Sequence, residues 1–535
     1  MATYDYVIVG AGSAGCVLAA RLTEDPDVSV LLLEAGPPDT SDLIHIPAAF
    51  AALFRTRQDW DHMTAWEPGL AGRRVYLPRG RTLGGSSSIN AMVYMRGNRA
   101  DYDEWAADGC TGWGYDDLLP YFKRSEDNER GANEYHGTGG PLPVADGRAR
   151  TQTCADFIEA AVAVGLQTNS DFNGAEQDGV GWYQVTQRDG RRASVAVGYL
   201  HPAMERPNLE VRTDCHVLKV VFEGTRAVGV QAIAADGLTE LRAEREVIVS
   251  SGTYNSPQLL MLSGLGRPDE LALLQVPLVA EAPEVGLNLS DHPTAGVVWV
   301  TDEPCSLKDA MTEENVAAWM AGQGPLTSNL AETGGFVRTR DDLTAPDVQF
   351  HMVPAMYAQE GLLPPPAHGI TLSACVLKPR SRGLVALPSP DPTVKPFIVH
   401  NYLTEPEDLR SAIEGVRLTM EITNTAPLQR YARQPYLVPA SDSDADIEAH
   451  IRATAQTIYH PVGTCRMGSD DASVVDPELR VRGVEALRVV DASVMPSVPR
   501  GNTNAPTIAL AERAADLIRG RAVETAVAGA GAGTV

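Results

Sequence analysis

Residues 4–36 carry the pattern that most constrains what the chain can fold into. Residues 6–9 are an apolar run, residues 10–15 (GAGSAG) form a glycine-rich turn, and residues 16–22 are mainly apolar. A second apolar run at 30–33 ends in Glu34. A strand, a GxGxxG turn, a helix and a second strand ending in an acid are typical of a Rossmann-like dinucleotide site. The sequence therefore predicts an α/β fold built on this unit.

Three glycines of this turn have separate physical roles. Gly10 permits the tight turn, Gly12 lets the backbone approach a pyrophosphate, and Gly15 lets helix and strand pack closely. The helix N-terminus presents free N–H groups to the phosphates, and Glu34 accepts hydrogen bonds from the ribose hydroxyls. This unit does not distinguish FAD from NAD. The cofactor contacts expected within it are Gly10, Gly12, Ser13, Ala14, Gly15, Glu34 and Ala35.

Length and composition exclude several classes of protein. A chain of 535 residues is too long for one simple core, which favours two domains. The net charge of −25 repels nucleic acid and anionic membranes, and no apolar run approaches the ~20 residues that span a bilayer. The seven cysteines are scattered and the N-terminus lacks a secretory pattern, which favours reduced thiols in a cytoplasmic protein. The histidines form neither HExxH nor a tight cluster, so we expect no metal.

Four further motifs follow the N-terminal unit. The loop at 79–90 (RGRTLGGSSSIN) is basic and rich in glycine and serine, so its backbone donors and small hydroxyls suit a cofactor. Residues 252–266 (GTYNSPQLLMLSGLG) predict a helix between two glycine turns. Near the C-terminus come residues 459–468 (YHPVGTCRMG) and residues 489–507, which contain VVDASVMP and GNTNAPT. A proline early in a first helical turn predicts that the last helix begins at Asn504.

With these motifs in this order, the chain resembles the glucose–methanol–choline (GMC) family of flavin-dependent oxidoreductases over residues 4–520. The resemblance implies FAD, with Glu34 on the adenosine ribose and the turn glycines at the pyrophosphate. Tyr459 either lines the pocket or packs beside the flavin. Further contacts are implied near the isoalloxazine ring, the adenine and the ribityl chain, from Leu83, Gly85, Asn90, Ala91, Met92, Val93, Val217, Asp491, Ala492, Asn504, Ala505 and Thr507.

The predicted architecture is the GMC oxidoreductase fold, an α/β fold with a Rossmann-like FAD-binding domain and an inserted α+β substrate-binding domain. Strand-like runs at 347–353 and 369–378 and a helical stretch at 405–426 give the inserted region its α+β character. The discontinuous FAD-binding domain is assigned to residues 1–155, 196–305 and 453–520, and the substrate-binding domain to residues 156–195 and 306–452. The Ala- and Gly-rich tail at 521–535 is expected to be disordered.

Oxidation of an alcohol needs a base for the hydroxyl proton while a hydride leaves the carbon, here for flavin N5. A histidine has a pKa suited to that step. The resemblance assigns the catalytic histidine to His460 and its partner, which is His or Asn in the family, to Asn504. His292 is interpreted as a structural residue in a turn near the cofactor. We therefore predict FAD-dependent oxidation of a primary alcohol to the aldehyde, with His460 as base and Asn504 orienting the substrate oxygen.

Two positions separate the chain from choline oxidase, a member of this family. Choline oxidase carries a flavin-linked histidine at the position of Ile89, so we expect non-covalent FAD. Choline-oxidising relatives carry a glutamate at the position of Thr294, where it faces the trimethylammonium group. Threonine favours an uncharged aliphatic or aromatic alcohol. Glu332 and a cation–π contact from Trp299 keep a choline dehydrogenase or oxidase as the alternative.

Two other classes are less favoured, and several properties stay open. A fatty-acid photodecarboxylase shares the flavin motifs but lacks the His460-Pro461 pair, and a non-catalytic flavoprotein has no use for His460 and Asn504. The expected partners are a small-molecule alcohol and an electron acceptor, either oxygen or a quinone or dye. We expect no nucleic acid and no membrane span, and a homodimer is one option for the oligomeric state.

Overall fold

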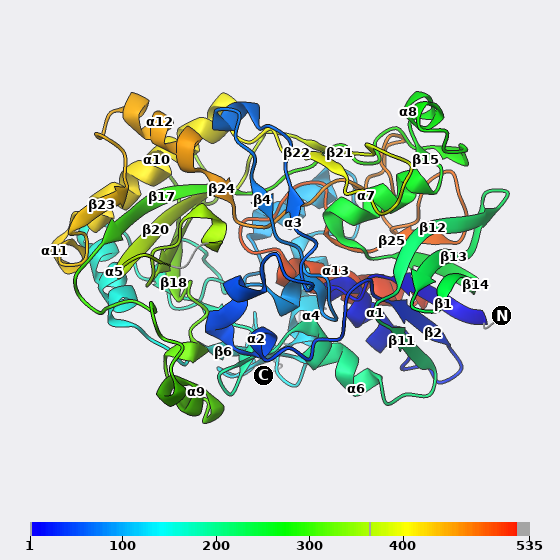
Figure 1. Ribbon diagram of the computed structural model, residues 1–535, viewed down its shortest axis with the longest axis horizontal. Coiled ribbons are helices and arrows are strands. Elements are labelled where there is room, and N and C mark those ends of the chain that lie inside the picture. Colours follow the sequence, from blue (N-terminus) through cyan, green and yellow to red (C-terminus); the bar gives the residue numbers. More distant parts are fainter. Residues whose placement is uncertain (1–2, 363–364, 522–535) are drawn as a thin grey trace, which may run out of the picture.

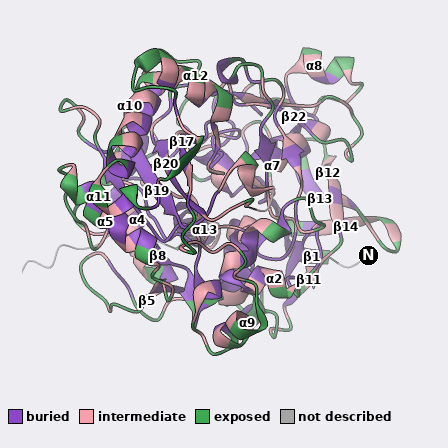
Figure 2. Ribbon diagram, turned by 60° about the vertical axis from the view of Figure 1, so that its left-hand side comes forward, coloured by how far each residue is buried: buried purple, intermediate pink, exposed green. Residues whose placement is uncertain are grey.

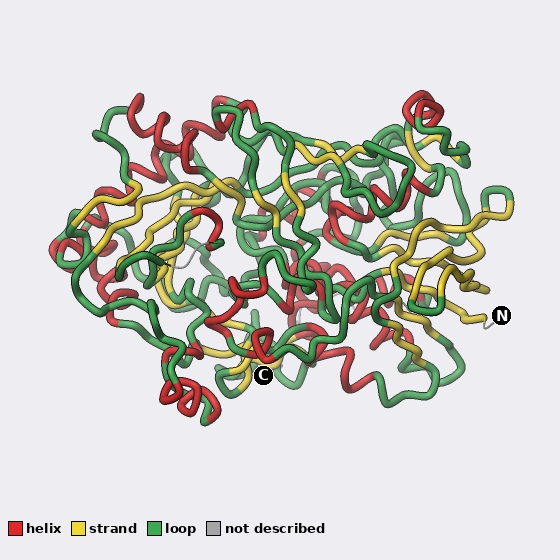
Figure 3. Tube along the Cα trace, in the orientation of Figure 1, coloured by secondary structure: helices red, strands yellow, loops and turns green. Residues whose placement is uncertain are grey.

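Two seven-stranded sheets dominate the chain and lie toward opposite ends of the molecule (Figure 1; Figure 3). The computed structural model describes residues 3–362 and 365–521, and the predicted disordered tail lies outside them from residue 522 onward. The mixture of sheets and helices confirms the predicted α/β class. Among the described residues, no helix combines the length and the apolar character needed to cross a membrane.

The first sheet forms around the N-terminal unit. Its spatial order is β11 (Leu209–Arg212), β2 (Val30–Leu33), β1 (Thr3–Val9), β14 (Gly237–Val249), β13 (Arg226–Ala234) and β12 (His216–Glu223), with β25 (Leu487–Val489) beside β14. β1 pairs in parallel with β2 and β14, whereas β12, β13 and β14 form an antiparallel meander. Every residue of β2 is buried, as expected for a parallel strand covered on both faces.

Helices from the two ends of the chain cover this sheet together. α1 (Ser13–Leu22) and α13 (Asn504–Ile518) pack against each other and share one hydrophobic core with β1 and β2. The predicted strand–turn–helix–strand unit and the predicted start of the last helix are both confirmed. The motif at 252–266 contains α7 (Gly252–Leu262), and the region after the serine-rich loop contains α3 (Arg99–Ala107) and α4 (Tyr115–Ser125).

The second sheet is antiparallel, and its strands come from residues 179–182, 293–376 and 434–457. Its spatial order is β23 (Gln434–Leu437), β17 (Pro293–Val300), β20 (Gly369–Val376), β19 (Val348–Val353), β18 (Thr333–Val337) and β7 (Gly179–Trp182), with β24 (Gln456–Thr457) beside β17. α5 (Gln152–Ala163) and α10 (Pro406–Thr423) pack on it. β17 and β24 come from ranges that the sequence assigned to the FAD-binding domain, and the domain boundaries stay a prediction.

Shorter elements complete the described chain. Figure 2 shows the strands β1, β2, β18, β19 and β20 mainly buried, whereas the outer helices and the strands β12, β14 and β23 are partly exposed. The other α-helices of four or more residues in the described chain are α2 (Asp42–His45), α8 (Pro268–Leu273), α9 (Glu313–Met320), α11 (Ala426–Gln429) and α12 (Asp444–Thr454). Further strands include β3 (His62–Met63), β4 (Tyr76–Leu77), β5 (Glu126–Asn128), β6 (Leu142–Asp146), β21 (Leu384–Ala386) and β22 (Phe397–Val399).

The pairing of β17 with β24 brings distant motifs together. Pro293 lies opposite Thr457 in an antiparallel register. The residues just before β17 therefore lie beside the residues just after β24, and the backbone N–H of Ile458 donates to the carbonyl of His292 at 3.0 Å. The start of α13 faces the same region, because Asn502 and His460 are in hydrogen-bond contact.

Candidate active site

A cavity of about 350 Å³ joins the glycine turn between β1 and α1 to the segment that follows β24. Its walls come from both sheets and from the start of α13. Most of the predicted site residues line it, whereas Gly15, Leu83 and Ala505 do not. The predicted residues that line the cavity are Gly10, Gly12, Ser13, Ala14, Glu34, Ala35, Gly85, Asn90, Ala91, Met92, Val93, Val217, Tyr459, His460, Asp491, Ala492, Asn504 and Thr507.

The glycine turn leaves room for a ligand at one end of the cavity. A Cβ on Gly10 would lie 2.5 Å from the carbonyl oxygen of Ser250, and one on Gly15 would lie 1.9 Å from that of Gly10. The protein's own packing therefore requires these two glycines. A Cβ on Gly12 would meet no protein atom closer than 4.0 Å. The missing side chain at Gly12 instead leaves cavity space in which a pyrophosphate fits against the backbone.

The carboxylate of Glu34 lies at the same end. Its Oε2 accepts a hydrogen bond from the backbone N–H of Ala11 at 3.0 Å, and its Oε1 accepts one from Gly36 at 2.8 Å. Burial raises the pKa of Glu34 to about 7, although these hydrogen bonds act in the opposite direction. Ribose hydroxyls that donate to the carboxylate would stabilise its ionised form, so the residues present fit a dinucleotide.

The serine-rich loop packs on the glycine turn and orients Asn90. A Cβ on Gly85 would lie 2.7 Å from the Cα of Gly12, so the two backbones are in close contact. The Oδ1 of Asn90 accepts hydrogen bonds from the N–H of Met92 at 3.0 Å and from Nη1 of Arg192 at 2.7 Å. This arrangement leaves the Nδ2 donor of Asn90 for the cavity that Asn90 lines.

The N-terminus of α13 also borders the cavity. No side chain caps the helix at Thr503, so its first N–H groups are available to a ligand. The Oδ1 of Asn504 accepts a hydrogen bond from the hydroxyl of Ser13 at 2.7 Å, which joins the starts of α13 and α1. Asp491 accepts hydrogen bonds from the N–H of Gly252 at 2.9 Å and from the hydroxyl of Ser256 at 2.6 Å. Both helix starts therefore face the cofactor end of the cavity.

His460 lies at the other end of the cavity, and its partner differs from the predicted one. The Nδ2 atom of Asn502 lies 3.1 Å from Nε2 of His460. The side chain of Asn504 contacts Ser13 instead, so the predicted pairing of His460 with Asn504 is wrong. Asn504 is the first residue of α13 and its side chain reaches α1, whereas Asn502 lies in the irregular segment before the helix and reaches the histidine.

A second histidine, His292, contacts His460 directly. The two Nδ1 atoms lie 3.0 Å apart, and Nε2 of His292 lies 2.9 Å from the carbonyl oxygen of Leu377. The Oδ1 of Asp291 accepts the backbone N–H groups of His292 at 2.9 Å and of His460 at 2.8 Å. One carboxylate thus fixes the backbones of both histidines, while no carboxylate of the described chain bonds either ring.

Burial is the main reason that both rings stay neutral at ordinary pH. It lowers the pKa of His460 well below its usual value, and His292, His351 and Arg79 lower that pKa further. Burial likewise lowers the pKa of His292 to about 3. A neutral imidazole has the free nitrogen lone pair that a general base needs.

The backbone just before His460 adopts an uncommon conformation. Tyr459 has a φ of 72°, in the left-handed region that aromatic residues rarely adopt. Nη2 of Arg79 donates to the carbonyl of Tyr459 at 2.8 Å, and the hydroxyls of Tyr459 and Tyr357 lie 2.9 Å apart. These contacts hold a strained turn at the cavity wall, where such backbone strain is typical of functional sites.

The cavity near His460 has aromatic walls and no acidic side chain from the described residues. Phe50, Phe54, Tyr357 and Tyr459 line this end, and the rings of Phe54 and Tyr459 meet edge to face with centroids 6.2 Å apart. Trp299, predicted as a source of a cation–π contact, does not line the cavity. Among residues 3–362 and 365–521, no group of three or more His, Cys, Asp or Glu is placed to hold a metal ion.

Two residues predicted to distinguish substrates have their polar atoms occupied. The hydroxyl of Thr294 donates to the carbonyl of Ala374 at 3.1 Å. The carboxylate of Glu332 accepts hydrogen bonds from Thr151 at 2.8 and 2.9 Å and from Ser328 at 2.6 Å, and Glu332 does not line the cavity. Neither side chain offers a counter-ion to a substrate.

Two residues of β19 near His460 were not singled out from the sequence. Nε2 of Gln349 lies 3.3 Å from Oδ1 of Asn502. His351 lines the cavity, and neither of its ring nitrogens has a hydrogen-bond partner among the described residues. The strand itself was predicted at 347–353. Period-two alternation places Gln349 and His351 on one face, which is the sequence signal that links them.

Comparisons with known proteins identify relatives over nearly the whole chain. Residues 4–294 and 379–511 match the N- and C-terminal sequence models described as GMC oxidoreductase. An alcohol dehydrogenase (acceptor) from Pseudomonas putida is 45% identical over 96% of this chain and 95% of its own length. The mitochondrial choline dehydrogenase of Homo sapiens is 44% identical over 97% of this chain and 90% of its own length. The crystal structure of pyridoxine 4-oxidase from Mesorbium loti superposes with a TM-score of 0.89 at 33% identity, covering 97% of this chain and 100% of that one.

Proposed function

The chain belongs to the GMC oxidoreductase family, and from that premise we propose that it oxidises an uncharged primary alcohol to the aldehyde. FAD is the electron acceptor within the protein, as the family implies. The observation that carries the proposal is one continuous cavity, which joins a dinucleotide site at Gly12 and Glu34 to the neutral imidazole of His460.

Residues from three segments would hold FAD at the cofactor end. The backbone at Gly12 and the starts of α1 and α13 would meet the phosphates and the flavin, Glu34 the ribose, and Asn90 the ring system. Bound FAD supplies the acceptor for the hydride that leaves the alcohol carbon. Ile89 lines the cavity and has no nucleophilic atom, which supports non-covalent binding. Precipitation of the protein with acid should therefore leave the flavin in the supernatant.

His460 and Asn502 would act together on the substrate hydroxyl. A hydroxyl within hydrogen-bond distance of both side chains donates its proton to Nε2 of His460 and accepts a hydrogen bond from Nδ2 of Asn502. As the proton moves, negative charge develops on the oxygen, and the amide donor stabilises it. The proposed role of orienting the oxygen thus passes from Asn504 to Asn502.

The charges around the cavity support an uncharged substrate. Within the described residues, Glu34 and Asp491 are the acidic side chains that line it, and both bond backbone N–H groups at the cofactor end. A quaternary ammonium beside His460 would lose its hydration without gaining a counter-ion, which is costly in a buried site. A hydroxyl on an apolar or aromatic body avoids that cost.

Choline is the second candidate, and the aromatic walls are the observation in its favour. Phe54 and Tyr459 could contact a trimethylammonium group through cation–π interactions, each contributing roughly 0.5–2 kcal/mol. The 44% identity to a choline dehydrogenase also supports this alternative. The proposal ranks it second because no carboxylate replaces the family's glutamate at Thr294.

The remaining assignments concern the acceptor and the location. A small-molecule alcohol and an external electron acceptor are the expected partners, and oxygen or a quinone would serve as that acceptor. We propose a cytoplasmic location, which is supported by the state of the cysteines. All seven fall within the described part of the chain, and all are free. A homodimer is proposed as the assembly to test first.

A panel of alcohols tests the proposed function. The FAD-loaded protein is mixed without oxygen with aliphatic, benzylic and furanic alcohols and with choline, and loss of flavin absorbance is recorded. Bleaching by uncharged alcohols at lower concentration than by choline supports the proposal. Bleaching by choline alone moves the assignment to the second candidate. A protein that no alcohol bleaches, but that releases an alkane from a fatty acid under blue light, contradicts both. Peroxide release in air then identifies an oxidase.

A further inference from the structure

We propose that His292 is a positioning residue that fixes the tautomer of His460, so that Nε2 of His460 carries no proton and faces the substrate. The inference rests on the proposed function and deepens it. It assigns a task to a buried side chain that the sequence interpreted as structural. The argument runs along one line of hydrogen bonds, from Leu377 through His292 and His460 to Asn502.

The first step begins at the carbonyl of Leu377. A carbonyl oxygen only accepts hydrogen bonds, so the 2.9 Å contact requires that Nε2 of His292 carries a proton. Burial keeps the His292 ring neutral, with its pKa near 3. A neutral imidazole with a proton on Nε2 has a bare Nδ1 that acts as an acceptor.

The second step passes from His292 to His460. The two Nδ1 atoms are 3.0 Å apart, which is hydrogen-bond distance, and the rings are nearly perpendicular at 88°. Because Nδ1 of His292 is the acceptor, Nδ1 of His460 must be the donor. The proton of the neutral His460 ring therefore resides on Nδ1, and Nε2 is left bare.

The opposite end of the line leads to the same tautomer independently. Oδ1 of Asn502 lies 3.3 Å from the amide nitrogen of Gln349, so the Nδ2 donor of Asn502 is turned toward His460. A donor 3.1 Å from Nε2 of His460 is satisfied only if that nitrogen accepts. Both ends thus require one arrangement, with the lone pair of Nε2 at the cavity.

The line of hydrogen bonds positions His460 but does not conduct away the proton that His460 takes from the substrate. When Nε2 takes the hydroxyl proton, His460 becomes a cation and still donates from Nδ1 to His292. A further transfer to His292 would require its Nε2 proton to leave toward the carbonyl of Leu377, which is not a base. The proton therefore leaves again through Nε2, from the cavity side.

The charged and titratable groups around the pair are consistent with a neutral ground state. Asp291 is buried beneath both histidines, but its oxygens accept backbone N–H groups and the hydroxyls of Tyr402 and Thr457 rather than a ring nitrogen. Arg79 and His351 are the other groups that influence His460, and both disfavour a positive ring. Orientation by a neutral histidine replaces the carboxylate that orients the base in a Ser-His-Asp triad.

The first measurement reads the tautomer itself in the complete FAD-loaded protein. With histidines labelled with ¹⁵N, NMR distinguishes a protonated ring nitrogen from a bare one, and His460→Gln identifies the His460 signals by their loss. We expect a protonated Nδ1 and a bare Nε2 at pH 7.5. A proton found on Nε2 overturns the proposal, whether or not any alcohol is oxidised. A substrate panel that fails leaves this result intact, so the two failures are distinguishable.

The second measurement removes the acceptor. His292→Phe should keep FAD but slow anaerobic flavin reduction by about 10- to 100-fold, the effect typical of removing a hydrogen-bond partner that orients a metal-binding histidine. His292→Asn retains an acceptor near the Nδ1 position and should recover most of the rate. His450→Asn is the control, because Nε2 of His450 also contacts a carbonyl, that of Gly296, at 2.7 Å. An unchanged tautomer and rate in a flavin-loaded His292→Phe contradict the proposal.

Discussion

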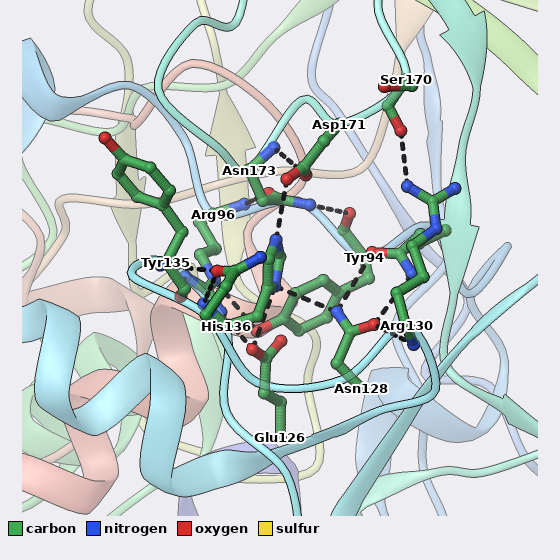
Figure 4. Close-up of polar contacts among 12 residues, drawn as sticks. Tyr94, Arg96, Glu126, Asn128, Arg130, Tyr135, His136, Ser170, Asp171 and Asn173 are labelled. Carbon is green, nitrogen blue, oxygen red and sulfur yellow. Dashed lines mark hydrogen bonds and ion pairs between the residues drawn. The ribbon is translucent and has the colours of Figure 1, made fainter.

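His460 in the cavity and His136 in the network of Figure 4 are both buried, yet their surroundings favour opposite charge states. Nδ1 of His136 lies 3.1 Å from Glu126, and Nε2 lies 3.0 Å from Asp171. Burial alone would lower the pKa of His136, but the hydrogen bonds to Asp171 and Glu126 outweigh burial and raise it. At His460 no carboxylate of residues 3–362 and 365–521 bonds the ring, and burial lowers its pKa unopposed.

The difference lies in what the nearby carboxylate binds. Asp291 accepts the backbone N–H of His460 and so positions the residue without charging it. Glu126 and Asp171 bind the ring of His136 on both sides and favour its cation. In this chain, the acid that binds the backbone of His460 leaves its ring neutral and able to act as a base, whereas the acids that bind the ring of His136 favour its cation.

The His136 network connects segments that lie far apart in the sequence. Nη2 of Arg96 lies 2.7 Å from Glu126 of β5, and the backbone N–H of Arg96 donates to Asn173 at 2.8 Å. The N–H of Asn173 in turn donates to Asp171 at 3.1 Å. Ion pairs and hydrogen bonds thus hold the segments around residues 96, 126 and 172 together, and the residues of this network do not line the cavity.

Removal of the catalytic imidazole is expected to have the largest effect. His460→Ala should retain FAD and lose turnover by about 10²- to 10⁴-fold, because the hydroxyl proton then has no positioned acceptor. Steady-state turnover normalised to flavin content measures this. Near-normal turnover in the flavin-loaded variant contradicts the assignment, and His136→Asn should leave turnover within about two-fold, since its network lies outside the cavity.

Loss of the structural cation should affect stability instead. His136→Asn should lower the free energy of unfolding by about 3 kcal/mol, the lower end for a broken buried ion pair, because Arg96 still pairs with Glu126. Chemical denaturation measures it. His201→Asn is the matched control, since His201 pairs with Asp39 at 3.0 Å but is exposed, and its loss should change stability by less than about 1 kcal/mol. Equal losses in the two variants would contradict the comparison.

Variants of Asn502, which contacts His460, and of Asn504, which contacts Ser13, test which asparagine acts on the substrate. Asn502→Ala should slow flavin reduction by about 10-fold or more, because the substrate oxygen loses a donor. Asn504→Ala removes the contact with Ser13 and should mainly weaken FAD binding. The rate of anaerobic flavin reduction and the affinity for FAD, both measured on each variant, show which asparagine has which role. A larger loss of rate in Asn504→Ala than in Asn502→Ala would support Asn504 as the partner of His460, as the sequence predicted.

The smallest expected effect is the pH dependence of stability. The pKa of His136 is raised, so its stabilising contribution is fully present below about pH 6.5 and is lost as the pH rises through the raised value. The pKa values of Glu126 and Asp171 are lowered by His136 despite their burial, so their contributions are present above about pH 4.5 and are lost as the pH falls. The stability difference between wild type and His136→Asn should therefore shrink from pH 6 to pH 9. A difference that grows over this range would contradict a charged His136.

Local patterns in the sequence predicted the secondary structure at the cofactor end of the cavity well. The strand, glycine turn and helix at 3–22 depend on neighbouring residues, and the same holds for the start of α13 at Asn504. Those signals are short-range, because backbone conformation and helix starts follow from nearby residue types. The family resemblance then added FAD and the alcohol chemistry, which the family membership supports.

The contact between His292 and His460 could not be predicted from the sequence pattern. His292 and His460 are 168 residues apart and meet only because β17 pairs with β24. The sequence predicted Asn504, not Asn502, as the partner of His460, and this prediction is wrong. The motif contains both asparagines, but which of them reaches His460 depends on the direction of their side chains at the start of the helix. The ion pairs of His136 could not be predicted from the sequence either, because Glu126 and Asp171 come from separate segments of the chain.

The most direct test of the central claim is the rate of anaerobic flavin reduction by an uncharged primary alcohol, measured against pH in wild type and His460→Ala. The claim is that a neutral His460 takes the hydroxyl proton. Its lowered pKa predicts a wild-type rate that is constant from about pH 7 to 8 and falls only at acid pH, as Nε2 of His460 becomes protonated. A wild-type rate that rises between pH 7 and 8, as it would if His460 lost its proton over this range, a rate that falls there, or the same rate and profile in His460→Ala would contradict the account.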